Sequence, residues 1–128
     1  MADEIVWLSE AILIAIHHRQ IAEHGGAEGI RDLGLLQSAL ARPKNILSYG
    51  DTSDLATLAA AYAFGIARDH PFMDGNKRAA LIAARTFLIL NGRNLDATQD
   101  DKYLTFMKLA EGTIDEVELA EWIRARLV

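Results

Sequence analysis

The stretch that decides the fold runs from Leu55 to Leu90 and reads LATLAAAYAFGIARD–HPFMDGNKR–AALIAARTFLIL. Its two flanks, Leu55–Asp69 and Ala79–Leu90, are dense in alanine, leucine, isoleucine and aromatic residues, and they predict two buried helices. The nine residues between them, His70–Arg78, include an imidazole, a carboxylate, a carboxamide and two cations. A turn between buried helices needs none of these polar groups, so function should be sought in this loop first.

The N-terminal part of the chain also reads as helices and their connections. Ser9 is a typical N-cap residue, and the helix that it begins is expected to end at Gly25–Gly26. Asp32 begins a second, shorter helix, and Pro43 is expected to stop it because proline lacks the N–H that the helix needs. Arg42–Asp54 is then the longest loop, and it either contacts a substrate or is a plain surface connection.

The helices on either side of the polar loop have clear ends. Ser53 or Asp54 caps the third helix, whose apolar residues recur at helical spacing. The fourth helix is expected to start within Gly75–Arg78 and to end at Asn91–Gly92, a good C-terminal stop. Because Ala79–Leu90 is apolar on nearly every side, this fourth helix is expected to be the central, buried one.

The C-terminal part predicts two more helices. One begins at Asp100, runs through Ala110 and is broken by Gly112, and Thr113–Glu116 has the pattern of a capping box that opens the last helix. The whole chain is therefore expected to be one all-α domain over residues 1–128, with about six helices and the polar loop between helices three and four. The apolar residues of the fifth helix are Tyr103, Leu104, Phe106 and Met107. The residues of the last helix that are expected to face inward are Val117, Leu119, Ala120, Ile123 and Leu127.

Composition narrows the class of protein. The 128 residues are 51% hydrophobic and 24% charged, as in an ordinary folded domain, and the net charge of −5 argues against a general nucleic-acid binder. With no cysteine, disulfides and thiolate metal sites are absent. The N-terminus lacks a basic segment followed by an apolar one, so it is not expected to be a signal peptide, and the longest apolar run, Leu55–Ala67, is too short to span a bilayer. We therefore expect a cytoplasmic protein without membrane or direct nucleic-acid contacts.

Three histidines of the first helix, His17, His18 and His24, raise the question of a metal site. His17 and His24 are seven residues apart and share one face of the helix. No carboxylate completes the set at ligand spacing, and histidines are common on helix surfaces. The preferred interpretation is that these histidines have no metal-binding role.

The polar loop carries the parts of a phosphoryl-transfer site. A helix that starts within Gly75–Arg78 directs free N–H groups and the positive end of its dipole at one point, and Lys77 and Arg78 add charge for a phosphate. Asp74 supplies a hard oxygen ligand for Mg²⁺. His70 can exchange a proton near neutral pH and is the candidate general base. Together these groups predict phosphoryl or nucleotidyl transfer.

The loop also resembles the signature of the Fic/Doc superfamily, HxFx(D/E)GNGRxxR, and in particular that of its death-on-curing (Doc) toxins. The block His24–Pro43 is similar to the corresponding segment of that branch. The resemblance implies an all-α bundle in which His70 deprotonates a target hydroxyl and Asp74 holds Mg²⁺. It further implies that Gly75, Asn76, Lys77 and Arg78 cradle the ATP phosphates. Phe72 would anchor the loop in the core, and Arg42–Asp51 would form a flap that positions the target.

Two departures from the general pattern point to the Doc branch. Leu81 stands where many Fic enzymes have a second arginine, and Arg85, one turn further, cannot simply replace it. Lys77 replaces the small glycine that lets an AMP-transferring enzyme seat the diphosphate close to the loop. In Doc-type toxins this change accompanies an inverted nucleotide that presents the γ-phosphate. The resemblance therefore implies a protein kinase.

The resemblance also implies partners. Self-inhibited Fic proteins carry an (S/T)xxxE(G/N) helix, whereas here Glu111 is preceded by Met107 and Glu28 by His24 at the Ser/Thr position. A separate Phd-like antitoxin that covers the active-site groove is therefore expected, and by resemblance the target is elongation factor Tu. The alternatives are AMP or other NMP transfer to a protein hydroxyl, and a catalytically silent nucleotide- or partner-binding module.

Overall fold

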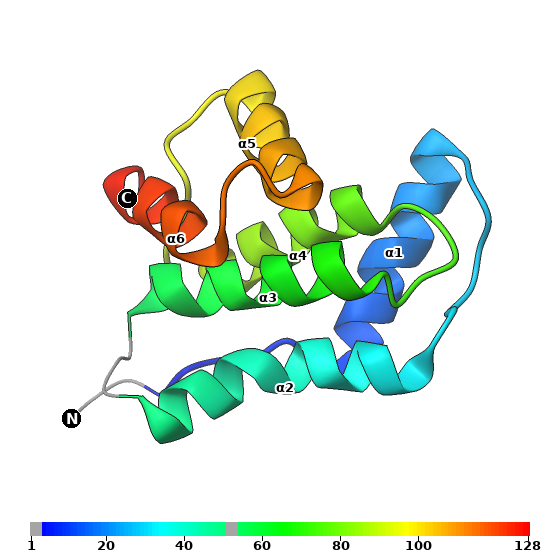
Figure 1. Ribbon diagram of the computed structural model, residues 1–128, viewed down its shortest axis with the longest axis horizontal. Helices are drawn as coiled ribbons and strands as arrows, with labels where there is room; N and C mark the ends of the chain where they lie inside the picture. Colours follow the sequence, from blue (N-terminus) through cyan, green and yellow to red (C-terminus); the bar gives the residue numbers. More distant parts are fainter. Residues whose placement is uncertain (1–3, 51–53) are drawn as a thin grey trace.

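The computed structural model describes residues 4–50 and 54–128, and over these residues the protein is a bundle of six α-helices (Figure 1). The described part contains no β-strand beyond two isolated bridges, Ile30 to Phe72 and Leu95 to Leu127. The all-α prediction is confirmed. The helices are α1 (Glu10–His24), α2 (Leu33–Tyr49), α3 (Leu55–Asp69), α4 (Asn76–Leu90), α5 (Gln99–Glu111) and α6 (Glu116–Ala125).

Short polar side chains start most of the helices, as predicted. Ser9, Asp32 and Asp54 each accept a hydrogen bond from a backbone N–H of the following turn, which satisfies a group that the helix leaves free. The other candidate cap of α3, Ser53, lies outside the described residues. The predicted capping box at Thr113–Glu116 is wrong in register. The reciprocal pair is Asp115 and Glu118, because Asp115 is the residue directly before the first helical turn.

Pro43 does not stop the second helix, which continues to Tyr49. Within a helix proline loses one hydrogen bond and crowds the carbonyl four residues earlier, at a cost of about 3 kcal/mol. Here the proline ring is fully buried between the helices, and this burial offsets the loss. The predicted loop Arg42–Asp54 is therefore helical over most of its length, and residues 51–53 lie outside the described part.

The central helix is α3, not α4 as the sequence predicted. Ten residues of α3 are buried, against six of α4, because α2, α4, α5 and α6 all pack against α3 (Figure 1). The C-terminal end of α4 is open, with Ile89 48% exposed. Gly65 lets α2 approach α3 closely, since a Cβ at that position would lie 3.2 Å from the Cα of Ala39. The α3 helix thus forms the axis of the core and ends at the polar loop.

The predicted inward face of the last helix is correct only in part. Leu119, Ala120 and Ile123 are buried as expected, but Val117 is 65% exposed. Of the apolar residues of α5, Phe106 is buried, whereas Tyr103 and Leu104 are exposed. In both helices the buried face is narrower than the apolar face, because each helix packs on the rest of the molecule along one side only.

Asn91 joins the end of α4 to the segment before α1. Its Oδ1 accepts a hydrogen bond from Val6 N at 2.8 Å, and its Nδ2 donates to Val6 O at 2.9 Å and to Phe87 O at 2.8 Å. The side-chain amide therefore pairs with the backbone of Val6 as a neighbouring strand would. This pairing holds the lead-in segment in place over the core, where Leu8 is buried.

Over the described residues, none of the helices combines the length and apolarity needed to cross a bilayer.

Candidate active site

The polar loop lies between α3 and α4 at one end of the molecule, and its residues line a pocket of about 510 Å³. This pocket brings together all six residues that the sequence predicted for the site. The α1 and α5 helices complete the walls. The predicted residues that line it are His70, Asp74, Gly75, Asn76, Lys77 and Arg78, and the others are Gln20, Ile21, His24, Gly25, Met73, Tyr103 and Met107.

His70 is the first residue after α3 and has a left-handed backbone, with φ 49° and ψ 61°. It is the only non-glycine residue of the described chain with a positive φ. This conformation costs an L-residue about 1 to 2 kcal/mol, and helix ends normally place glycine there. The side chain is exposed toward the pocket. An unfavourable backbone conformation is thus found at a residue that carries an imidazole, directly after the central helix.

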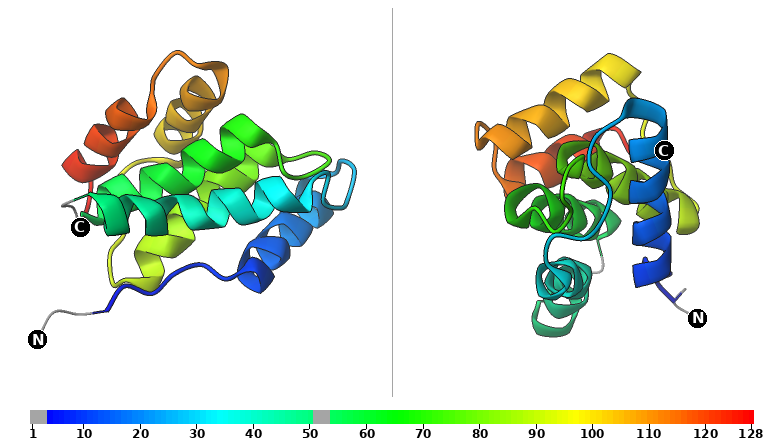
Figure 2. Two further views of the ribbon diagram at one scale, coloured as in Figure 1. Left: turned by 60° about the horizontal axis from the view of Figure 1, so that its bottom comes forward. Right: turned by 90° about the vertical axis from the view of Figure 1, so that its right-hand side faces the viewer.

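The segment between α1 and α2, residues 25–32, lies alongside the loop like a short strand (Figure 2, right). Met73 N donates to Gly29 O at 3.0 Å, and the backbone N–H groups of Arg31 and Asp32 both donate to Pro71 O. The predicted flap at Arg42–Asp51 is not an extended flap, because α2 remains helical to Tyr49. The extended segment beside the motif loop comes from earlier in the chain.

The same segment approaches the carboxylate of Asp74. Asp74 Oδ1 accepts a hydrogen bond from Gly75 N at 2.8 Å, and Oδ2 accepts one from Ala27 N at 3.3 Å. The absence of a side chain at Gly26 makes this possible, since a Cβ there would lie 2.7 Å from Asp74 Oδ2. Each oxygen keeps a lone pair for a cation. A single carboxylate is the kind of protein ligand that Mg²⁺ takes when it arrives with phosphates. Residues 4–50 and 54–128 contain no cluster of three or more metal-ligating side chains.

The start of α4 provides the groups for an anion. Gly75, the N-cap, has φ 73° and gives no side-chain hydrogen bond, so the N–H groups of the first turn stay available to a ligand. Lys77 and Arg78 are exposed beside them. The Arg78 guanidinium lies 5.6 Å from the ring centroid of Tyr103 and 3.5 Å from His24 Nε2. These contacts hold Arg78 on the α1 and α5 side of the pocket.

Asn76 uses its side chain to close the loop. Its Oδ1 accepts from Phe72 N at 3.0 Å, and its Nδ2 donates to Phe72 O at 3.1 Å. Phe72 is 1% exposed, which confirms the predicted core anchor. The amide of Asn76 is therefore occupied within the loop, and its backbone N–H is the group left for a phosphate. The prediction that Asn76 contacts phosphate stays a prediction, with the backbone as the contacting part.

Sequence reasoning missed two residues that support the loop, His17 and Arg31. The sequence favours a surface position for His17, but it is 4% exposed and contacts the loop directly. Its position was a signal, since it lies four residues after Leu13 and four before Ile21, the two other buried residues of α1. Arg31 donates from its guanidinium to the carbonyl oxygens of Asp69 and His70, both at 2.6 Å. Arg31 lies within the block His24–Pro43 that resembles the Doc branch, but that resemblance does not indicate this contact.

Known proteins are similar to most of this chain. A model of the Fic/DOC family matches residues 7–88. The chain belongs to the Fic/DOC family. The protein named "Protein kinase doc", from Escherichia phage P1, is 33% identical over 117 residues, which cover 91% of this chain and 92% of that protein. "Toxin Doc" from Mycolicibacterium smegmatis is 46% identical over 77 residues, which cover 59% of each protein. The resemblance to the Doc branch is confirmed.

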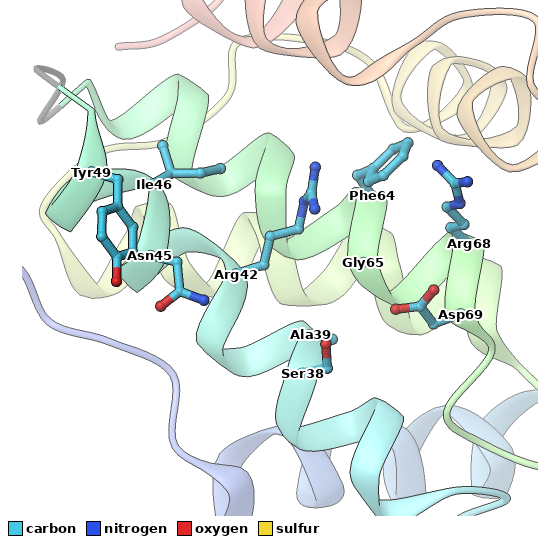
Figure 3. Close-up of a pocket in the computed structure, with 10 residues that line it drawn as sticks. All are labelled: Ser38, Ala39, Arg42, Asn45, Ile46, Tyr49, Phe64, Gly65, Arg68 and Asp69. Atoms are coloured by element: carbon cyan, nitrogen blue, oxygen red, sulfur yellow. The ribbon is translucent and has the colours of Figure 1, made fainter.

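This Fic/DOC protein has a second pocket, of about 480 Å³, between α2 and α3 (Figure 3). Arg42 and Arg68 both place their guanidinium groups near the Phe64 ring, 4.7 and 5.4 Å from its centroid. Arg42 also forms an ion pair with Glu116 of α6. None of the six predicted site residues lines this pocket, although Asp69, directly before His70, does.

Proposed function

We propose that this protein is a toxin that transfers the γ-phosphate of ATP to a serine or threonine hydroxyl of a host protein. The observation that carries the proposal is the single pocket in which His70, Asp74 and the uncapped start of α4 meet. A proton acceptor, a metal-binding carboxylate and an anion site are the parts that phosphoryl transfer requires. The names of the two relatives, a protein kinase and a toxin, support the same activity.

The chemistry follows from the positions of the groups. His70 removes the proton from the target hydroxyl, whose oxygen then forms a bond to the γ-phosphorus. The bond from that phosphorus to the β,γ-bridging oxygen breaks, and ADP leaves. The backbone N–H groups at the start of α4, beginning with that of Asn76, act with Lys77 and Arg78 to stabilise the negative charge on the phosphates. Asp74 would hold Mg²⁺, which when bound neutralises phosphate charge.

The choice of the γ-phosphate over AMP transfer rests on Lys77. It occupies the position at which AMP-transferring relatives have glycine, and a long cation beside the start of α4 displaces the phosphates from the closest approach to the backbone. The lysine side chain is exposed and free to meet the nucleotide. This argument favours a nucleotide that presents its terminal phosphate to His70.

The proposed partners follow the Doc branch. The target is elongation factor Tu in the cytoplasm, and a small Phd-like antitoxin covers the active-site groove. Inhibition by a separate chain is supported by Met107 and His24, which stand at the positions where an internal inhibitory helix would need serine or threonine. Both residues line the pocket, so an antitoxin segment that enters it would contact them.

The decisive experiment incubates the protein with elongation factor Tu and ATP labelled at either the α- or the γ-phosphate. We expect label on the factor only from γ-labelled ATP, and loss of at least about a hundredfold in rate for His70→Ala and Asp74→Ala. Label that arrives only from the α-phosphate would establish AMP transfer instead. Magnesium-dependent ATP binding without any labelled product would establish a silent binding module.

A further inference from the structure

We infer that Arg31 is a positioning residue for the proposed general base, and that it acts by fixing the backbone on which the His70 imidazole stands. This inference rests on the proposed role of His70. It adds to the site a residue that does not line the pocket and lies outside the motif loop.

Arg31 holds three consecutive carbonyl oxygens at the point where α3 ends. Its Nε donates to His70 O and its second guanidinium nitrogen donates to Asp69 O, both at 2.6 Å. Its backbone N–H donates to Pro71 O at 2.7 Å. The last carbonyls of a helix have no partner within the helix, and a cation near them is favourable. The guanidinium thus supplies both the missing donors and the matching charge.

The backbone conformation of His70 sets the direction of its imidazole, because few other contacts hold that side chain. Within the described chain, no hydrogen bond or ion pair reaches the His70 imidazole from another side chain or from the backbone. The left-handed φ and ψ of His70 therefore set the direction of its Cα–Cβ bond, and with it the reach of the imidazole into the pocket. A residue that stabilises this unusual backbone also stabilises the position of the base.

The contact requires arginine in particular. The planar guanidinium presents two N–H donors at fixed spacing and can bind two neighbouring oxygens at once, whereas the lysine ammonium is a single point. The Arg31 side chain is exposed, so its removal leaves no cavity in the core. The backbone pairing of Arg31 with Pro71 also persists in any variant except proline. Substitution of Arg31 therefore tests the guanidinium alone.

The test compares Arg31→Met and Arg31→Lys with Arg93→Met as a matched control. Arg93 is also exposed and also donates to a backbone carbonyl, Val128 O at 3.2 Å, but it lies away from the pocket. With elongation factor Tu and ATP, we expect Arg31→Met to lower kcat by about tenfold to a hundredfold while KM for ATP changes less than twofold. Arg31→Lys should fall between the two, and Arg93→Met should match the wild type.

Amide hydrogen exchange provides a measurement that does not depend on activity. The His70 N–H donates to Ile66 O at 3.2 Å, and we expect its protection to fall in Arg31→Met but not in Arg93→Met. Unchanged kcat and unchanged protection in Arg31→Met would overturn the inference, as would a change confined to KM. A wild-type protein that does not transfer the γ-phosphate would overturn the proposed function, and the exchange comparison would still decide whether Arg31 fixes His70.

Discussion

The imidazole of His17 lies flat against the ring of Phe72, with the two centroids 3.9 Å apart and the ring planes 1° from parallel. Nε2 of the same imidazole is 2.8 Å from the backbone carbonyl oxygen of Asp74. One buried side chain of α1 therefore contacts both the core anchor of the loop and the residue proposed to hold Mg²⁺. Since His17 is more than fifty positions before Phe72 and Asp74 in the chain, the docking of α1 helps to fix the loop from outside.

His17 combines a ring contact with a hydrogen bond, and two substitutions separate them. His17→Phe keeps the stacked ring but leaves Asp74 O without its donor, at a cost of about 1 to 3 kcal/mol in the free energy of unfolding. His17→Gln keeps a donor but loses the ring. We expect His17→Phe to weaken binding of the Mg²⁺–ATP complex more than His17→Gln does, as measured by titration calorimetry. Equal affinities in both variants would show that the hydrogen bond does not position Asp74.

Gly26 makes room for the Asp74 carboxylate, and Gly26→Ala should displace it. The added Cβ would lie 2.7 Å from Asp74 Oδ2, and the φ of +118° adds backbone strain. Gly92→Ala is the control, because Gly92 also has a positive φ, +79°, but open space around it. We expect both variants to lose stability in thermal unfolding. Only Gly26→Ala should lower Mg²⁺-dependent ATP affinity, by about tenfold, and equal affinity in both variants would contradict this role.

The buried hydroxyl of Tyr62 should make the protein less stable to unfolding at alkaline pH. Its hydroxyl is buried in α3 and accepts a hydrogen bond from Leu8 N at 3.1 Å, and burial raises the pKa of Tyr62 to about 12. Above about pH 10 the unfolded chain releases the phenolic proton while the folded protein keeps it. The free energy of unfolding should therefore fall by about 2 to 3 kcal/mol between about pH 10 and pH 12.

Tyr62→Phe provides the comparison for this pH dependence. It lacks the titrating group but leaves Leu8 N without an acceptor, so it should be less stable than the wild type near neutral pH by about 1 to 3 kcal/mol. Urea denaturation at increasing pH should then show the two free energies converging above about pH 10. A constant difference between the proteins would show that Tyr62 titrates alike in the folded and unfolded chains.

The ion pair between Asp54 and Arg124 should make the stability of the protein depend on pH in acid. Partial burial by itself raises the pKa of the Asp54 carboxyl, but hydrogen bonds from Arg124 and Thr57, with the charge of Arg124, lower it below its usual value overall. The unfolded chain therefore takes up the proton first as the pH falls below about 4. The stabilisation is present above that pH and is lost as the pH falls through the lowered pKa.

Arg124→Met should reduce this acid dependence. The variant keeps most of the aliphatic part of the side chain but removes the charge and the hydrogen bonds of Arg124 that lower the pKa of Asp54, so it should be less stable near neutral pH. Its free energy of unfolding should also decline less steeply as the pH falls below about 4, as measured by urea denaturation. Parallel declines in both proteins would assign the acid sensitivity to other carboxylates.

Local patterns in the sequence were enough to predict six helices, where most of them begin, and the residues of the polar loop. Caps such as Asp32 act within one turn, and the polar loop brings its own residues together because it is short. The prediction that Pro43 ends the second helix is wrong. The lost hydrogen bond of proline can be read from the sequence, whereas the burial that offsets this loss depends on the packing of other helices. His17 and Arg31 were missed for the same reason, since their partners lie 57 and 39 residues away.

The pairing of Asn91 with Val6 has a consequence for the chemical ageing of the protein. Asn91 is followed by Gly92, and asparagine before glycine is the dipeptide most prone to lose ammonia and become aspartate. Deamidation would replace the Nδ2 donor with an anionic oxygen that faces the carbonyls of Val6 and Phe87. The segment before α1 would then lose the hydrogen bond from Asn91 to Val6 O. In a stored sample we therefore expect this segment to detach from the core before the helices unfold.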